Sequence, residues 1–222
     1  MKYLIFDTSS LISLSTNDFL WVLEALQKKF QGDFVIPASV KKEVIEYPLK
    51  TNRFRLEAIR VSHLVHTKVL HIHKPLDANY LLHLANSIFS RKGNKIHIVD
   101  LGEMEALSLA LYHHAEALVV DERTTRLLVE NPLRLKDIFE NKFHESIEMD
   151  QEALHQFQKE VKGLHILRSS ELLAVALEEG LLNNLIDKHH TKKFLLDAIL
   201  WSLRLRGCAI STQEIKDMVR LA

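Results

Sequence analysis

Short runs of apolar residues recur along the first 140 residues of the chain, separated by polar segments with helical periodicity. A short, unbroken apolar run is typical of a parallel strand that is buried on both faces. The pattern predicts strands at residues 3–6, 34–37, 69–72 and 117–120. It predicts helices at residues 11–14, 18–30, 40–46, 53–66, 77–89, 103–114 and 124–130. Strands that alternate with helices indicate an α/β fold with a parallel sheet and right-handed crossovers.

Beyond about residue 140 the alternation gives way to successive helices. Amphipathic segments predict helices at residues 151–161, 170–179, 191–205 and 211–219. Residues 165–167 form either one added strand or an extended linker. We therefore divide the chain into an α/β domain at residues 1–142 and a mostly helical C-terminal extension at residues 143–222. The boundary has no hinge rich in Pro or Gly, which leaves open that the extension packs on the same core.

Composition narrows the class of protein. The 222 residues include 29 Lys and Arg against 29 Asp and Glu, and this balance excludes the capture of polyanions by bulk positive charge. The one cysteine, Cys208, fits a reducing compartment. No apolar run approaches the roughly 18 residues that span a bilayer. We expect a cytoplasmic protein that has no membrane partner.

The most informative polar residues are four acids. Asp7 and Asp121 end predicted strands, Glu43 lies just after the second strand, and Glu103 opens the helix that precedes the last strand. Ligands of open parallel sheets bind at the carboxyl ends of the strands, so these carboxylates are expected to meet there. Their mutual repulsion would be balanced by a hard divalent cation, for which Mg²⁺ or Mn²⁺ is the natural choice. Such an ion could polarise a phosphodiester and generate hydroxide from water.

Each of these acids also has a purely structural interpretation. Acidic side chains are common at helix N-termini, where they interact favourably with the helix dipole. For Asp7 alone, a helix cap and a functional role are equally good interpretations, and Glu43 alone is best explained as exposed helix surface. The joint arrangement favours a site, because an apolar run ends in Asp at two separate places, Asp7 and Asp121.

Three segments resemble the PIN-domain nuclease family: LIFDTSSLISL, FVIPASVKKEVIE and DLGEMEALSLALYHHAEALVVDERTTRLL. They follow the family's order, and the third is the most specific, with its Gly-Glu-x-Glu-Ala motif and an Asp at a strand end. The later segment ILRSSELLAVALEEGLL is similar to the C-terminal extensions of that subgroup. The resemblance implies a three-layer α/β/α sandwich with a central parallel sheet. It also implies a metal-dependent nuclease that usually acts on RNA.

The resemblance assigns roles to individual residues as well. The family's first acid falls on Asp7, its second on Glu43 and its fourth on Asp121. The hydroxyl residue that often supports the first acid falls on Ser9. In the family these acids hold Mg²⁺ or Mn²⁺, so the same positions are the expected metal ligands here.

The family's third acid falls on either Glu103 or Glu105. Residues two apart on a helix point to nearly opposite sides, so only one of the two is expected to hold the metal. We prefer Glu103, because it shares a helix face with small and apolar residues such as Ala106 that suit packing on the sheet. Glu105 then has a supporting or surface role, and Asp100 and Glu122 are alternates.

Basic residues flank these acids and could contact the phosphate backbone of a substrate: Lys42, Arg123 and Arg126. Simple solvation explains them equally well, and Arg126 could instead pair with an acid. A phosphatase of the haloacid dehalogenase type is disfavoured, since it needs Asp-x-Asp after the first strand. Ser9 occupies the second of those positions.

The sequence therefore predicts an endoribonuclease in which a carboxylate-bound divalent ion activates water. The alternative is a catalytically inactive PIN-like scaffold that binds RNA or a protein. The expected partners are an RNA substrate, a second copy of the chain in a homodimer, and a protein inhibitor or antitoxin. The simplest family members lack the C-terminal extension, so the toxin role of many small members does not carry over directly.

Overall fold

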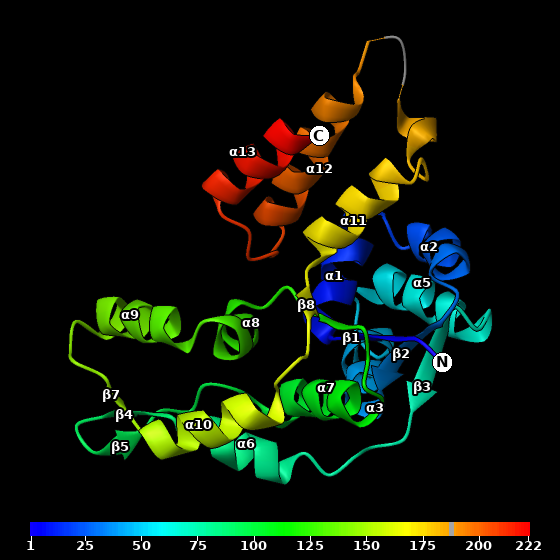
Figure 1. The fold of residues 1–222 in the computed structure, drawn as a ribbon. Coiled ribbons are helices and arrows are strands. Elements are labelled where there is room, and N and C mark those ends of the chain that lie inside the picture. Colours follow the sequence, from blue (N-terminus) through cyan, green and yellow to red (C-terminus); the bar gives the residue numbers. More distant parts are fainter. Residues whose placement is uncertain (187–188) are drawn as a thin grey trace.

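The computed structural model describes residues 1–186 and 189–222. Its centre is a five-stranded parallel sheet with the strand order β3–β2–β1–β6–β8 (Figure 1). The strands are β1 (Tyr3–Phe6), β2 (Asp33–Pro37), β3 (Leu70–His73), β6 (Ala117–Val119) and β8 (Ile166–Leu167). The sheet confirms the predicted α/β class and its parallel topology.

Side chains alternate between the two faces of the strands, and both faces are covered by apolar residues. On β1, Leu4 and Phe6 belong to one core, whereas Ile5 between them belongs to the other. On β2, Phe34 and Val35 divide in the same way. This double burial explains why the strands appear in the sequence as unbroken apolar runs.

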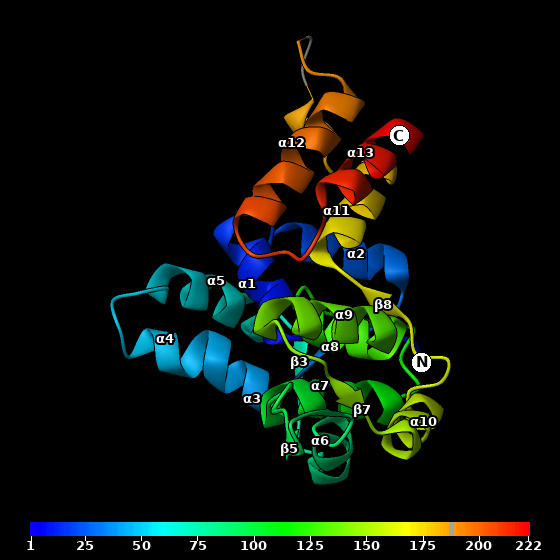
Figure 2. The same ribbon diagram turned by 90° about the vertical axis from the view of Figure 1, so that its left-hand side faces the viewer.

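Helices cover both faces of the sheet and complete the sandwich (Figures 1 and 2). The first core is covered by α1 (Thr8–Thr16), α2 (Val22–Phe30), α3 (Ala38–Lys41), the π-helix η1 (Lys42–Glu46), α5 (Arg55–His66), α11 (Ser169–Glu178), α12 (Lys192–Leu205) and α13 (Thr212–Leu221). The second core is covered by α6 (Asn79–Ala85), α7 (Leu101–Tyr112), α8 (Arg123–Glu130), α9 (Pro132–Phe143) and α10 (Gln151–Glu160). The short helices α4 (Tyr47–Leu49) and η2 (Asn183–Leu185) connect longer elements.

Two parts of the fold differ from the prediction. Helix α9 occupies a segment in which the apolar pattern predicted no element. Its start is encoded by Asn131, whose side chain accepts a hydrogen bond from the Arg134 amide at 3.1 Å, and by Pro132 at the first helical position. A small antiparallel sheet, not predicted either, joins β4 (Phe89–Arg91) to β5 (Asn94–Lys95) and β7 (Glu148–Met149).

The C-terminal extension is built into the same core as the α/β domain. Strand β8 is the edge strand next to β6, and leucines of α11 and α12 lie in the first core. Arg168, just before α11, donates hydrogen bonds to Glu171, to the Ala209 carbonyl and to Glu214 on α13. These bonds link the start of α11, the segment between α12 and α13, and α13 itself. Within the described part of the chain, no helix has both the length and the apolar character needed to cross a membrane.

Candidate active site

The strand order creates a switch point between β1 and β6. From β1 the chain moves to β2 and β3 on one side of the sheet, and it then crosses to β6 on the other side. In parallel sheets, the space outside the carboxyl ends of two such strands is where ligands bind. Asp7 directly follows β1, and Asp121 lies two residues beyond β6, so both acids are placed at this switch point.

Asp7 caps helix α1 and is held by its neighbour Ser9. The carboxylate Oδ2 accepts hydrogen bonds from the Ser9 amide at 3.0 Å and from Ser9 Oγ at 2.7 Å. Asp7 is only 4% exposed, and this burial raises its pKa above the ordinary value. The hydrogen bonds from Ser9 lower the pKa, and the nearby charge of Glu43 raises it further.

Ser9 joins the two sides of the switch point. Its hydroxyl donates to Asp7 and accepts hydrogen bonds from the backbone amides of Asp121 at 2.9 Å and Glu122 at 3.2 Å. These three bonds use the full capacity of a hydroxyl group, which has one donor and two acceptor positions. Ser9 thus links the start of α1 to the loop after β6 through hydrogen bonds.

Glu43 reaches the site from the π-helix η1. Short π-helical segments often occur at functional sites. Glu43 Oε2 accepts a hydrogen bond from Thr8 Oγ1 at 2.7 Å. Its other oxygen lies so close to Gly102 that a Cβ atom at Gly102 would be 2.9 Å from Oε1. Glycine at this position lets the start of α7 approach the carboxylate.

Glu103 lies in the first turn of α7 and folds back onto the start of the helix. Its Oε2 accepts a hydrogen bond from the Asp100 amide at 2.8 Å, as in a capping box. Burial raises the pKa of Glu103 to about 7, and the negative charges of Glu122, Asp7 and Asp100 contribute to the rise. Glu103 therefore interacts electrostatically with acids from both sides of the switch point.

The side chain of Asp121 makes its hydrogen bonds with the C-terminal extension. It is fully buried, its Oδ1 accepts a hydrogen bond from the Ser169 amide at 2.7 Å, and its Oδ2 accepts one from Ser169 Oγ at 2.5 Å. The Asp121 carbonyl also accepts from the Ala209 amide at 3.1 Å. Asp121 thus caps the start of α11 and fastens the C-terminal extension to β6.

The neighbouring acid, Glu122, interacts with Glu103 instead. Its charge is among those that raise the pKa of Glu103, and its Oε2 accepts a hydrogen bond from the Thr125 amide at 2.7 Å. The structure therefore brings Asp7, Glu43 and Glu103 together with Glu122, which the sequence offered only as an alternate. We call these residues the acidic group: Asp7, Glu43, Glu103 and Glu122.

The remaining predicted residues lie around the acidic group. Glu105 is half-buried on α7, and its Oε2 is a buried atom without a hydrogen-bond partner in the structure. Asp100 accepts a hydrogen bond from His97 Nε2 at 2.7 Å when that nitrogen carries the proton. Arg126 pairs with Glu130 at 3.0 Å on its own helix. Lys42 and Arg123 are exposed.

Thr8 and Gly102 were not predicted from the sequence, yet both contact Glu43. Thr8 follows the first acid directly, and Gly102 is the glycine of the Gly-Glu-x-Glu-Ala motif. Their positions in the sequence mark them as neighbours of acids. Their contact with Glu43 depends on three elements converging, which no local pattern encodes.

The acidic group offers the kind of donor that a hard divalent cation prefers. Carboxylate oxygens are the usual protein ligands of Mg²⁺ and Mn²⁺. Burial and the charges of neighbouring acids raise the pKa values of Asp7 and Glu103, and a bound cation would lower both. Within residues 1–186 and 189–222, no three His, Cys, Asp or Glu side chains already form a metal-holding set. The group therefore fits such an ion by its chemistry, and each side chain is meanwhile held by protein donors.

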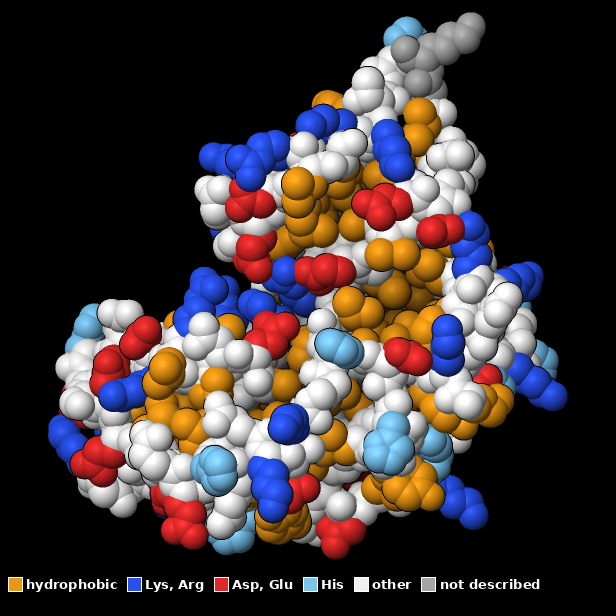
Figure 3. Space-filling view, in the orientation of Figure 1, with side chains coloured by type: hydrophobic (Ala, Val, Ile, Leu, Met, Phe, Trp, Pro, Cys, Tyr) orange, Lys and Arg blue, Asp and Glu red, His pale blue; other side chains and the backbone are white. Residues whose placement is uncertain are grey.

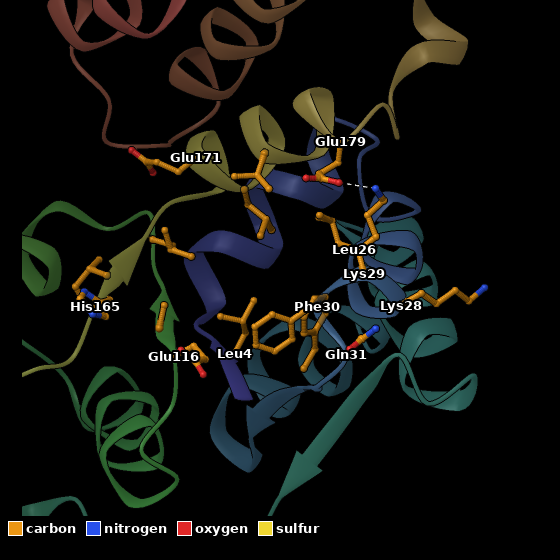
Figure 4. Close-up of a pocket in the computed structure, with 16 residues that line it drawn as sticks. Leu4, Leu26, Lys28, Lys29, Phe30, Gln31, Glu116, His165, Glu171 and Glu179 are labelled. Atoms are coloured by element: carbon orange, nitrogen blue, oxygen red, sulfur yellow. Dashed lines mark hydrogen bonds and ion pairs between the residues drawn. The ribbon is translucent and has the colours of Figure 1, made fainter. Parts of the chain in front are cut away.

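An apolar cavity lies elsewhere on the molecule. It has a volume of about 890 Å³ and lies between α2 and α11, where apolar side chains line a hollow in the surface (Figures 3 and 4). Leu4, Phe34 and Ala117 form part of its lining near the amino ends of their strands. An ion pair between Lys29 and Glu179, 2.5 Å apart, lies at its border. This cavity is distinct from the acidic group at the carboxyl ends.

Comparison with known proteins agrees with the fold and with the motifs. The family model described as PIN domain matches residues 3–132, which include β1, β2, β6 and all four members of the acidic group. No curated protein shows significant similarity to the chain. PIN domains are typically nucleases, and the family generally uses a divalent metal. Since the match covers more than half of the 222 residues, the chain belongs to the PIN domain family.

Proposed function

We propose that this protein is a divalent-metal-dependent endoribonuclease. The observation that carries the proposal is the convergence of acids from four separate elements at the switch point, where burial and neighbouring negative charge raise the pKa values of Asp7 and Glu103. Asp7, Glu103 and Glu122 accept hydrogen bonds at the starts of helices, and no ion pair of the described residues involves a member of the acidic group. Here burial and mutual repulsion leave negative charge that a divalent cation would balance.

Asp7, Glu43, Glu103 and Glu122 would hold the ion, and Ser9 would keep Asp7 and the β6 loop in register through its three hydrogen bonds. When bound, Mg²⁺ or Mn²⁺ supplies Lewis acidity toward a phosphodiester oxygen and lowers the pKa of coordinated water. Asp121 has a different role in this proposal. It positions the loop that carries Glu122, since both of its carboxylate oxygens accept hydrogen bonds from Ser169.

The substitution Asp7→Asn tests the proposal. It removes one negative charge and keeps an acceptor for Ser9, so the fold should persist while RNA cleavage in Mg²⁺ falls by about 100-fold or more. Cleavage of a labelled RNA is measured together with Mn²⁺ binding by titration calorimetry. Asp137→Asn is the matched control, because Asp137 is an exposed acid on α9 outside the acidic group.

The outcomes separate the proposed enzyme from an inactive scaffold. Loss of cleavage and of Mn²⁺ binding in Asp7→Asn, with Asp137→Asn unchanged, supports the nuclease. Undiminished cleavage by Asp7→Asn would overturn it. A wild-type protein that binds RNA but neither takes up Mn²⁺ nor cleaves would be a PIN-like scaffold.

A further inference from the structure

A second cavity, of about 520 Å³, separates the α/β domain from the C-terminal helices. It is bounded by α8 and α9 on one side and by the end of α12 and the segment that follows it on the other. Three cations line it: Arg123 from the start of α8, Lys142 from α9 and Arg204 from α12. Figure 3 shows Lys and Arg side chains gathered in the notch between these two parts of the molecule. We call this cavity the basic cleft.

The three cations of the basic cleft are not held in ion pairs within the part of the chain that the structure describes. Among the ion pairs of the described residues, none involves Arg123, Lys142 or Arg204. Arg204 is instead held by neutral groups, since it donates to Thr212 Oγ1 at 2.6 Å and lies 5.3 Å from the centre of the Trp201 ring. A neutral chain thus concentrates positive charge in one cleft, which indicates an anionic ligand.

The basic cleft adjoins the acidic group. Glu122 lines the cleft, and the same carboxylate acts electrostatically on Glu103. A ligand that lies along the three cations would therefore have its next segment beside the carboxylates. Three cations that share a cleft with a member of the acidic group suit a ligand made of successive phosphodiesters.

We propose that the basic cleft binds the backbone of single-stranded RNA next to the bond that is cut. The proposal rests on the proposed nuclease function and extends it, because Arg204 belongs to the C-terminal extension and gives that extension a part in substrate binding. The volume of the cleft is in the range of pockets for drug-sized ligands, which accommodates a short stretch of one strand. Arg123 and Arg204 offer planar donors that match phosphate oxygens, and Lys142 adds a point charge.

The test measures binding without cleavage. Anisotropy of a fluorescein-labelled, single-stranded oligoribonucleotide of about 10 nucleotides is followed in EDTA at several salt concentrations. Each phosphate contact on a single strand contributes about 0.7 to the slope of log affinity against log salt concentration. The triple variant Arg123→Ala, Lys142→Ala, Arg204→Ala should lower that slope by about 2 and weaken binding by about tenfold or more at moderate salt.

Two further variants distinguish binding in the cleft from an effect of net charge. Lys216→Ala is the matched control, because Lys216 is an exposed cation of the C-terminal extension that does not line the cleft. It should leave affinity and slope unchanged. Arg204→Lys keeps the charge, so it should retain most of the affinity that Arg204→Ala loses, and circular dichroism shows whether each variant is folded.

The proposal is overturned if the folded triple variant binds the RNA with wild-type affinity and slope. It is also overturned if Lys216→Ala reduces binding as much as Arg204→Ala, since the net charge of the protein would then explain the loss of RNA affinity. Failure of the nuclease proposal is distinguishable, because Asp7→Asn tests cleavage in Mg²⁺ whereas the cleft is tested by binding in EDTA. Cleft-dependent binding without any cleavage would retain the cleft as an RNA-binding site and overturn the nuclease.

Discussion

At the scale of the residue, Glu103 should make the stability of the metal-free protein depend on pH. Its pKa of about 7 in the folded protein lies above the 4.5 of an unperturbed Glu, so the folded state holds the proton more tightly than the unfolded state. The contribution of Glu103 to the free energy of unfolding is therefore fully present below about pH 4.5 and is lost as pH rises through about 7. A difference of this size corresponds to about 2 kcal/mol once partial exposure and coupling are allowed for.

Urea denaturation in EDTA at about pH 5 and about pH 8 measures this effect. In Glu103→Gln the fall in unfolding free energy over this range should be smaller than in the wild type by about 2 kcal/mol. Glu178→Gln, on the exposed face of α11, is the control and should behave as the wild type. An equal fall in Glu103→Gln and the wild type would show that Glu103 does not titrate in this range.

Gly102 makes a second prediction at the same scale. A methyl group at this position would stand 2.9 Å from Glu43 Oε1, and the exposed end of the Glu43 side chain can move away. Gly102→Ala should therefore change the unfolding free energy by less than about 1 kcal/mol, since alanine favours the helix. Mn²⁺ affinity should fall by about tenfold, because the displaced carboxylate no longer faces the ion.

Calorimetric Mn²⁺ titration and urea denaturation of the same Gly102→Ala sample separate these two effects. Leu101→Ala, in the same helical turn and 44% exposed, serves as the control. Unchanged Mn²⁺ affinity in Gly102→Ala would show that the position of Glu43 does not matter for the ion.

At the scale of the element, the join between β6 and α11 depends on Asp121. An amide at this position would place an NH₂ group among donors, because both carboxylate oxygens now accept hydrogen bonds from Ser169. Asp121→Asn should lower the free energy of unfolding by about 3 kcal/mol, the order expected when a buried polar group loses its hydrogen-bond partner. Urea denaturation measures this loss.

Glu122→Gln provides the comparison for Asp121→Asn. Glutamine can still accept the hydrogen bond from the Thr125 amide, so its unfolding free energy should stay within about 1 kcal/mol of the wild type. It should nevertheless bind Mn²⁺ less tightly. The opposite pattern, with Asp121→Asn stable but unable to bind Mn²⁺, would show that Asp121 is a metal ligand.

This pair of acids also shows what the sequence can predict and why the rest escapes it. The strands were predictable, because their apolar runs are unbroken, and the sequence places Asp7 at the end of the first run and Glu43 after the second. Asp121 and Glu122 are adjacent, so only the packing of Ser169, 48 positions later, decides which of them turns inward. Strands as short as β7 and β8 have two residues each and carry no periodicity of their own.

At the scale of the whole molecule, the C-terminal extension is part of the structure on which the acidic group depends. It supplies the edge strand β8, the Ser169 contacts of Asp121 and one wall of the basic cleft. Among the buried side chains that it adds to the first core are five leucines of α11 and α12: Leu172, Leu173, Leu196, Leu200 and Leu203. Burying a leucine contributes about 2 kcal/mol, so these side chains together contribute about 10 kcal/mol.

That sum is as large as the whole net stability of a typical domain, which is about 5–15 kcal/mol. A chain that ends at residue 142 should therefore fail to fold cooperatively, although it contains every member of the acidic group. Near-ultraviolet circular dichroism and urea denaturation of this fragment, beside the full chain, make the test. A fragment with a sigmoidal unfolding transition and wild-type Mn²⁺ affinity would show that the α/β domain stands alone. A fragment without fixed tertiary structure would show that the extension completes the core, and thereby holds the acids in place.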